Sequence, residues 1–378
     1  SAAEARDRLW YAQHMLKPVL SGRGRAPTAV YGMLARATLN HGVLGVGQGV
    51  SALTYKMPTD VHLDLAVTRG DFPGLDTVYK KAETAQWVPD LALDWPTDVD
   101  PMNTERPIFP AYMLPVYGHP LYNRMTPRQQ QQLIADFTSW SLHQFYFGEQ
   151  GARAVAAKLA LAVPSESARQ MAATQVFDEA RHVDVFGRYL REKLPDSHFE
   201  MDPNLGILLE TLVMSGDWAA AFLGMQIMIE GLAHGSFRTI AGLTQEPLLK
   251  SMLEFVIIDE ARHVAFGKVM LKRYFAALTE AERKFYSELA AEFVWLMYNR
   301  FMGENLRQRF FPSIRRREWV PMVQQSQLME HYRREVFSGI VTSLVTIGLV
   351  DRANKGQVER RLEEMGILDL VDRKSTRL

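Results

Sequence analysis

The pentapeptide Asp-Glu-Ala-Arg-His occurs twice in the chain, in two copies 81 residues apart. Each copy follows an upstream glutamate at the same distance. Thirty residues separate Glu149 from Glu179, and thirty separate Glu230 from Glu260. A repeat that keeps acidic and imidazole groups in register indicates a site built from two matching halves.

The spacing also predicts that the two glutamates of each pair lie side by side. The midpoint between Glu149 and Glu179 falls at the Pro164-Ser165 break, and the second pair is centred on a similar break at 244–247. In an antiparallel helical hairpin, residues equidistant from the turn lie at the same height. Each arm of the hairpin spans about 22 Å at 1.5 Å per residue, so each glutamate pair lies far from its turn.

A histidine stands three residues after the second glutamate of each pair, on the same helix face. Packing the two hairpins together brings four carboxylates and two imidazoles to one level. Carboxylates buried without compensation repel one another and retain protons, whereas two divalent cations balance their charge. Oxygen and nitrogen ligands suit iron and manganese. The sequence therefore predicts a dinuclear metal site held by Glu149, Glu179, His182, Glu230, Glu260 and His263.

A single Glu-x-x-His on a helix is commonplace and is usually a solvated surface pair. Two copies with matched partners and a turn at both midpoints favour metal ligands, because packing alone does not require these residue types at facing interior positions. The chain contains no cysteine, which excludes disulfides, thiolate metal sites and iron–sulfur clusters.

The segments on either side of Thr126 differ in amino-acid composition. Residues from about 21 to 125 are rich in proline and glycine, which predicts short helices and ordered loops wrapped on a larger core. Thr126-Pro127 is typical of a helix start. Four long helices are expected after it, at about 127–162, 166–193, 205–242 and 247–277.

Further helices are expected at 2–20 and 279–302, with two or three more over 314–366. No alternating strand pattern follows Thr126. We therefore expect an all-α fold. We also expect one domain over 1–378, made of an N-terminal wrap (1–125), a metal-binding four-helix core (126–278) and C-terminal helices (279–378).

Charge and hydropathy narrow the functional classes. The 378 residues include 43 basic and 43 acidic side chains, so the chain lacks the basic excess of nucleic-acid-binding proteins. Its apolar run at 340–350 is too short to span a membrane. The first ten residues are charged and lack the apolar core of a signal peptide, so a cytoplasmic location is expected.

Residues about 127–277 resemble the ferritin-like diiron carboxylate oxygenases and oxidases. That superfamily includes multicomponent monooxygenase hydroxylases, arylamine N-oxygenases and the ribonucleotide reductase small subunit. The form Asp-Glu-x-Arg-His is most similar to the hydroxylases. Phe186 stands where the reductase subunit usually carries its radical tyrosine, which argues against a reductase. The resemblance implies a ferritin-like four-helix bundle, the same six metal ligands and a homodimer.

The resemblance also assigns roles around the ligands. In similar proteins, an aspartate placed like Asp178 and Asp259 accepts a hydrogen bond from a ligand histidine of the facing helix, and Arg181 and Arg262 would balance these aspartates. Ordinary surface ion pairs are the alternative interpretation. The pocket residues expected beside the metals are Phe145, Phe186, Met225, His234 and Phe266. Plain core packing explains the apolar ones equally well.

Together these features favour a non-haem dinuclear iron oxygenase that uses O2 to hydroxylate or N-oxygenate a small, mostly apolar organic substrate. Two iron ions are the expected cofactor, with manganese or a mixed manganese–iron pair left open. Because the chain lacks an iron–sulfur relay and a flavin motif, electrons are expected from a separate reductase or ferredoxin, or from the substrate. A ferroxidase or iron-storage protein and a manganese catalase remain the alternatives.

Overall fold

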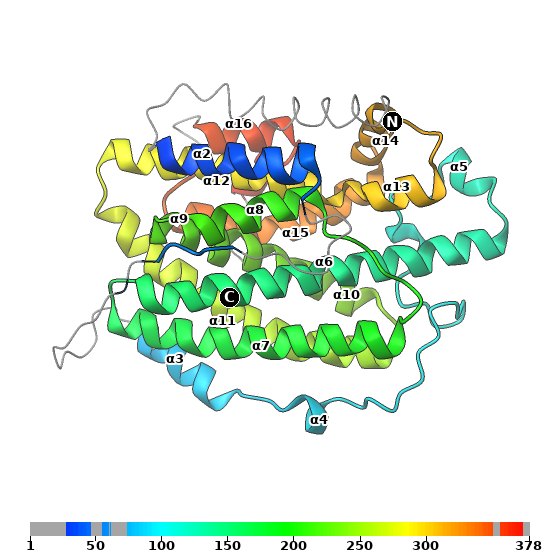
Figure 1. Cartoon of the computed structure of the whole chain (residues 1–378), viewed down its shortest axis with the longest axis horizontal. Helices are drawn as coiled ribbons and strands as arrows, with labels where there is room; N and C mark the ends of the chain where they lie inside the picture. Colours follow the sequence, from blue (N-terminus) through cyan, green and yellow to red (C-terminus); the bar gives the residue numbers. More distant parts are fainter. Residues whose placement is uncertain (1–27, 47–54, 60, 62–73, 351–355, 373–378) are drawn as a thin grey trace.

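The computed structural model describes residues 28–46, 55–59, 61, 74–350 and 356–372 (Figure 1). Throughout these ranges the regular secondary structure is helical, without a strand, which confirms the all-α prediction. The helix predicted for 2–20 lies outside the described residues.

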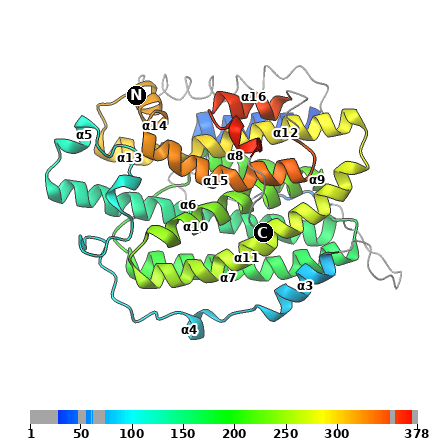
Figure 2. The ribbon, with the colours of Figure 1, turned by 180° about the vertical axis from the view of Figure 1, so that it is seen from behind.

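Four helices form the ferritin-like bundle at the centre of the molecule. They are α6 (Pro127–Ala162), α7 (Glu166–Lys193), α10 (Glu230–Leu243) and α11 (Pro247–Ala276). α6 packs along α7, and α10 packs against α11, so the chain forms two helical hairpins. In Figures 1 and 2 the two hairpins lie against each other, with α7 and α11 side by side.

Local chemistry explains why the first hairpin begins and turns where predicted. Thr126 caps α6 through a reciprocal pair of hydrogen bonds with Gln129, and Pro127 occupies the first turn. Val163 has an extended backbone, because the residue before a proline is disfavoured in the helical region. Ser165 then caps α7 by accepting a hydrogen bond from the Ala168 N–H.

The single helix predicted over 205–242 is wrong. The chain instead forms α8 (Pro203–Met214), breaks, and resumes as α9 (Trp218–Phe222), which continues through a π-helical stretch at Leu223–Ile229 into α10. Asp217 caps the new helix by accepting from two backbone N–H groups. The ammonium of Lys158 binds the carbonyls of Leu212 and Val213, which ends α8.

The described part of the segment before α6 consists of short elements. α2 (Thr28–Ala37) lies on α8, and α3 (Leu75–Thr84) packs across α7 and α11. The other described elements before α6 are a π-helical stretch at Thr38–Leu44, α4 (Pro89–Ala92), a 3₁₀ turn at Ala111–Met113 and α5 (Pro120–Asn123). The wrap therefore reaches the face of the bundle where α7 and α11 meet.

Helices after α11 cover the other side of the bundle (Figure 2). The predicted fifth helix is α12 (Glu280–Asn299), extended by a 3₁₀ turn at Arg300–Met302. The others are α13 (Glu304–Phe310), α14 (Arg316–Gln324), α15 (Gln327–Thr346) and α16 (Gln357–Glu364). α15 packs on α10.

One cluster of buried apolar side chains runs from Val30 to Leu370 and joins wrap, bundle and C-terminal helices. We propose on this basis that the three segments form one domain. Among the described helices, none combines the length and apolarity that crossing a membrane requires.

Candidate metal centre

The four bundle helices place all six predicted ligands in the interior. Glu149 comes from α6, Glu230 from the start of α10, and each of α7 and α11 supplies one glutamate and one histidine. Every one of these residues is at most 4% exposed. The six residues therefore converge at one level, although their sequence positions span 115 residues from Glu149 to His263.

The six side chains form two groups that share two carboxylates. In each group the candidate donor atoms lie within 4.8 Å of one another. Glu149 and His182 belong only to the first group, and Glu230 and His263 only to the second, whereas Glu179 and Glu260 belong to both. This is the arrangement of two cation positions bridged by two glutamates.

In the first group, Nδ1 of His182 faces three carboxylates. It lies 3.4 Å from Glu149 Oε2, 3.3 Å from Glu179 Oε2 and 3.3 Å from Glu260 Oε1. Donor atoms from α6, α7 and α11 thus surround one point.

In the second group, Nδ1 of His263 faces the other oxygens of the shared glutamates. It lies 3.3 Å from Glu179 Oε1, 3.2 Å from Glu260 Oε2 and 3.7 Å from Glu230 Oε2. Each shared glutamate therefore directs one oxygen to each group, as a carboxylate bridging two cations does.

The donor set fits a pair of divalent cations. Glu179 Oε2, Glu260 Oε1 and His182 Nδ1 are buried, and none makes a hydrogen bond within the described part of the chain. Orphaned buried polar atoms are unfavourable, and here they point at one another. Burial, together with the nearby Glu260 carboxylate, raises the pKa of Glu230 well above its usual value. Metal ions would hold these carboxylates ionised, and carboxylate and imidazole donors suit iron or manganese.

The effect of burial on the Glu149 carboxyl can be tested in the metal-free protein. Burial raises its pKa from 4.5 to about 7, against the opposing effect of His182. In the folded state this carboxyl therefore ionises only near pH 7, whereas in the unfolded chain it ionises near pH 4.5. As the pH rises from 4.5 to 7, the free energy of unfolding of the wild type falls relative to that of Glu149→Gln, whose amide does not titrate. We expect the difference in unfolding free energy to change by on the order of 3 kcal/mol in favour of the variant over this interval.

Urea unfolding of both proteins with a chelator present, from pH 4 to pH 8, measures this difference. Glu192→Gln, at a more exposed position on α7, is the control and should show no such trend. A difference between Glu149→Gln and wild type that stays constant with pH would contradict the prediction.

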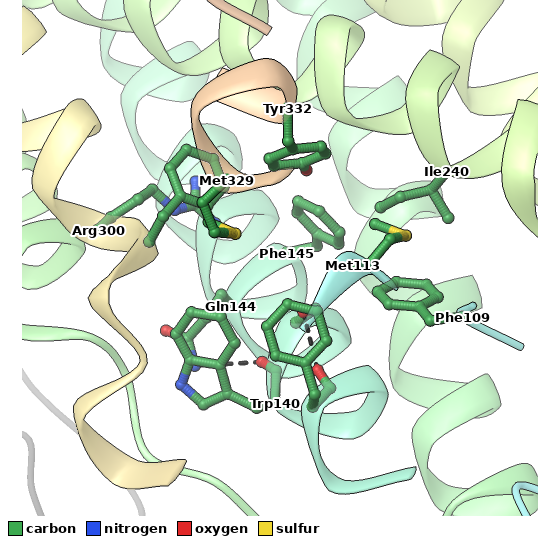
Figure 3. A pocket seen from close by; sticks show the side chains of 12 residues that line it. Phe109, Met113, Trp140, Gln144, Phe145, Ile240, Arg300, Met329 and Tyr332 are labelled. Atoms are coloured by element: carbon green, nitrogen blue, oxygen red, sulfur yellow. Dashed lines mark hydrogen bonds between the residues drawn. The ribbon is translucent and has the colours of Figure 1, made fainter. Parts of the chain in front are cut away.

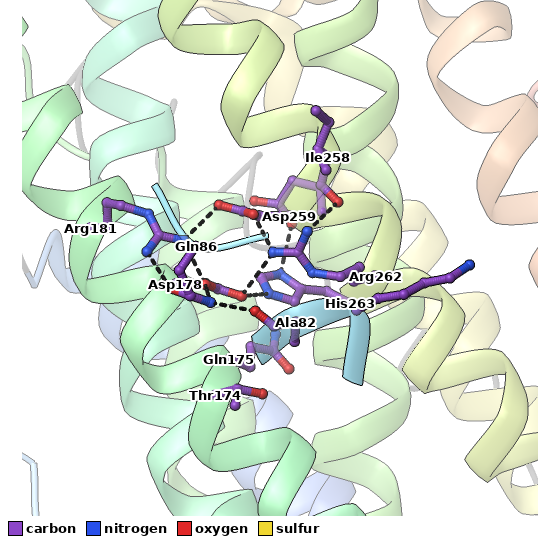
Figure 4. A network of polar contacts seen from close by, with 12 residues as sticks. Ala82, Gln86, Thr174, Gln175, Asp178, Arg181, Ile258, Asp259, Arg262 and His263 are labelled. Atoms are coloured by element: carbon purple, nitrogen blue, oxygen red, sulfur yellow. Dashed lines mark hydrogen bonds and ion pairs between the residues drawn. The ribbon is translucent and has the colours of Figure 1, made fainter. Parts of the chain in front are cut away.

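Asp178 and Asp259 join the two hairpins behind the histidines (Figure 4). Nε2 of His182 on α7 lies 3.1 Å from Asp259 Oδ2 on α11, and Nε2 of His263 on α11 lies 3.3 Å from Asp178 Oδ2 on α7. An ionised carboxylate only accepts hydrogen bonds. Each Nε2 therefore carries a proton, which leaves Nδ1 as the nitrogen that would bind a cation.

Two arginines compensate these buried aspartates (Figure 4). Arg181 donates to Asp178 over 2.6 Å and to Asp259 over 2.9 Å. Arg262 donates to Asp259 and lies 3.5 Å from Asp178. Both guanidinium groups are nearly buried, so these contacts differ from the solvated surface pairs of the alternative interpretation.

Four further polar residues at the centre were not predicted from the sequence. The Trp87 indole N–H donates to Asp259 over 2.8 Å, and Gln86 bonds to both Asp178 and Arg181. The Gln175 amide donates to Glu179 and Glu230, and Gln226 donates to Gln175. Gln175 stands one turn before Glu179 on the ligand face of α7, so helical periodicity alone could have placed it at the centre. Gln226 stands one turn before Glu230 in the same way, whereas Gln86 and Trp87 carry no local signal.

A small apolar cavity of about 20 Å³ lies along the N-terminal half of α6 (Figure 3). Its apolar walls include Phe109, Met113, Phe137, Trp140, Phe145 and Phe301. The polar side chains that line it are Ser141, Gln144, Arg300 and Tyr332. Phe145 precedes Glu149 by one helical turn, so this cavity adjoins the first ligand group.

Of the five predicted pocket residues, only Phe145 lines this cavity. Phe186 contacts Phe145, and the centroids of their two rings are 6.2 Å apart. Met225 and Phe266 are fully buried in the core. His234 belongs to neither candidate ligand group, and burial together with the charges of Arg238 and Lys268 lowers its pKa to about 4.

Comparison with known proteins gives one family match. The model of the family described as P-aminobenzoate N-oxygenase AurF matches residues 75–348. The matched region begins at α3 and includes all four bundle helices and all six candidate ligands. No protein with a curated description matches the chain.

Proposed function

This chain belongs to the AurF family of p-aminobenzoate N-oxygenases, which are diiron enzymes, and we propose that it uses O2 to oxygenate the amino group of a small aromatic substrate at a dinuclear iron site. The observation that carries the proposal is that Glu179 and Glu260 each belong to both ligand groups. Family membership favours this reaction over iron storage and over a manganese catalase.

An iron pair, when bound, supplies the redox chemistry that activates O2. In the proposed reaction one oxygen atom forms a bond to the amine nitrogen, which gives a hydroxylamine. The other oxygen atom leaves as water, after taking up two electrons and two protons. Because substrate supplies only two of the four electrons that O2 accepts, an external donor provides the other two.

The chain's own residues would hold and shield this centre. Glu149, Glu179, His182 and Glu260 would bind one ion, and Glu179, Glu230, Glu260 and His263 the other. Asp178 and Asp259 would fix the two imidazoles through their Nε2–H groups. The Gln175 amide, which donates to Glu179 and Glu230, would limit how far these carboxylates can turn.

Aromatic side chains beside the first ligand group would exclude water. The rings of Phe145 and Phe237 meet edge to face, with centroids 4.9 Å apart, and Phe186 stacks on Phe237 at 5.4 Å. Phe145 and Phe186 stand one turn from Glu149 and His182. Substrate would reach the centre from the Glu149 side, where the small cavity lies along α6.

A single-turnover experiment with isotopically labelled dioxygen tests the function. Protein loaded with ferrous iron is mixed with ¹⁸O2, a chemical reductant and either aniline or 4-aminobenzoate. We expect a product that contains one ¹⁸O atom from at least one amine, and none from iron-free protein. Ferric mineral without labelled product would support storage instead, and rapid decomposition of hydrogen peroxide by manganese-loaded protein would support a catalase.

A further inference from the structure

Residues 86–97, which we call the strap, run along the face of the bundle formed by α7 and α11 (Figures 1 and 2). The strap follows α3 and contains the single turn α4. The other two bundle helices have a second layer of helices outside them, because α8 packs on α6 and α15 packs on α10. In the described part of the chain, the outer face of α7 and α11 is covered by α3 and the strap.

Side chains hold the strap in place. In the described part of the chain, its backbone-to-backbone hydrogen bonds join strap residues to one another. Trp87, Leu93 and Trp95 are buried, whereas Val88 and Leu91 are 55% and 86% exposed. A segment with few buried side chains and local backbone hydrogen bonds opens at a lower free energy than the helices that it covers.

One end of the strap contacts the aspartates behind the ligand histidines (Figure 4). The indole N–H of Trp87 donates to Asp259 over 2.8 Å, and the Gln86 amide donates to Asp178 over 3.1 Å. These two aspartates hold the Nε2 atoms of the ligand histidines. The Trp87 ring also stacks on Phe255 at a centroid distance of 5.0 Å. A strap that lifts from the bundle therefore takes a hydrogen-bond donor away from each aspartate.

Charged side chains of α7 fasten the other end of the strap. Arg188 pairs with Asp90 over 2.6 Å, and its guanidinium carbon lies 4.0 Å from the centre of the Trp95 ring. The Lys193 ammonium donates to the carbonyls of Trp95 and Thr97 over 2.7 and 2.8 Å. None of these residues belongs to a candidate ligand group, so this end can be released without altering the metal centre directly.

We propose that the strap is the gate of the metal centre, so that metal ions enter and leave through the α7–α11 face when the strap lifts from it. Lifting withdraws Trp87 and Gln86 from the two aspartates, and the aspartates and the histidines that they hold are then free to turn outward. Docking of the strap closes the centre and fixes the donor atoms. The inference goes beyond the proposed function, because it concerns metal exchange and needs neither O2 nor an amine.

Exchange of cobalt(II) tests the inference, because this ion binds carboxylate and imidazole ligands and its complexes absorb visible light. Stopped-flow absorbance follows uptake by the metal-free protein and loss into an excess of chelator. In Arg188→Gln both rates should rise about 10-fold, while the number of bound ions and their affinity stay as in the wild type. Arg191→Gln, at an exposed arginine on the same helix, is the matched control and should exchange cobalt at the wild-type rates.

A covalent link between the strap and α7 supplies the opposite test. Because the chain contains no cysteine, Asp90→Cys and Arg188→Cys can be combined and joined selectively by a bifunctional maleimide. The unlinked double variant should exchange cobalt faster than the wild type, and linking should return both rates to the wild-type values or below. Wild-type protein treated with the same reagent is the control and should not change.

Wild-type exchange rates in Arg188→Gln, or rates in the double variant that linking does not slow, would overturn the inference. A faster loss without a faster uptake would also overturn it, because the strap would then only position the ligands. Lys193→Gln, which releases two strap carbonyls, gives the same test if Arg188→Gln does not fold. Gated cobalt exchange without labelled product from the turnover experiment would refute the oxygenase and leave the gate standing. Labelled product together with exchange that ignores the strap would do the reverse.

Discussion

Glu179→Ala should abolish binding of both metal ions, whereas Glu149→Ala should remove only one. Glu179 contributes an oxygen to each of the two ligand groups, and Glu149 contributes to the first group alone. Removing the shared carboxylate therefore withdraws an anionic ligand from both positions. Metal analysis after anaerobic loading with ferrous iron and gel filtration measures the stoichiometry, which should be about two in the wild type, one in Glu149→Ala and near zero in Glu179→Ala.

The metal-free Glu179→Ala protein should remain folded. Burial and the neighbouring Glu230 raise the pKa of the Glu179 carboxyl, so this carboxylate is unfavourable in the absence of metal. Urea unfolding with a chelator present should show stability no lower than that of the wild type, apart from the effect of the small cavity. Glu192→Ala serves as the control on α7 and should retain two ions. Two ions in Glu179→Ala would refute the bridging role.

Asp259→Asn should destabilise the metal-free protein by about 3–5 kcal/mol. Asp259 is fully buried and accepts from His182, Trp87 and Arg181 over 3.1, 2.8 and 2.9 Å, and also from Arg262. Burial alone would raise the pKa of this carboxyl, but the hydrogen bond and charge of His182 outweigh burial and lower it. An amide keeps the shape and loses the charge, which leaves two buried guanidinium groups to share Asp178.

The same substitution should weaken metal binding unevenly. Asp259 contacts His182 of the first ligand group, so affinity at that position should fall about 10- to 100-fold, while the His263 position should change less. Urea unfolding and competitive metal titration provide the two measurements. Asp184→Asn, at an exposed aspartate on α7, is the control. A loss below about 1 kcal/mol would show that the aspartate–arginine network contributes little to the fold.

The bundle and the convergence of the six acidic and imidazole side chains could be predicted because the relevant information is local and periodic. Equal spacing about two turns fixes which residues of a hairpin are level with each other, and three-residue spacing fixes a common helix face. The helix start at Thr126 and the turn at Pro164-Ser165 are equally local, since caps and prolines act within a few residues.

The break before α9 combines a local signal with a distant contact. Ser215-Gly216-Asp217 is a turn and cap sequence inside the apolar pattern of 205–242, and Asp217 caps α9. The carbonyls of Leu212 and Val213 near the end of α8 accept hydrogen bonds from Lys158, which comes from α6. That partner lies more than fifty residues away, so no local window of sequence contains it.

The lining of the cavity depends on tertiary packing in the same way. Phe186, Met225 and Phe266 have the spacing of site residues, but that spacing does not distinguish a cavity wall from a filled core. The walls combine α6 with residues from the wrap, from the 3₁₀ turn after α12 and from α15, such as Phe109, Arg300 and Tyr332. Trp87 reaches Asp259 in the same way, across 172 residues of sequence.

The sequence by itself indicated the candidate metal centre, because the duplicated motif sets the type, number and level of its candidate ligands through helix geometry alone. Only the tertiary structure decided which glutamates are shared, how the aspartates cross between hairpins and which side chains line the space beside Glu149. Those features depend on how separate helices rotate and pack against one another, and that packing is a property of the whole core.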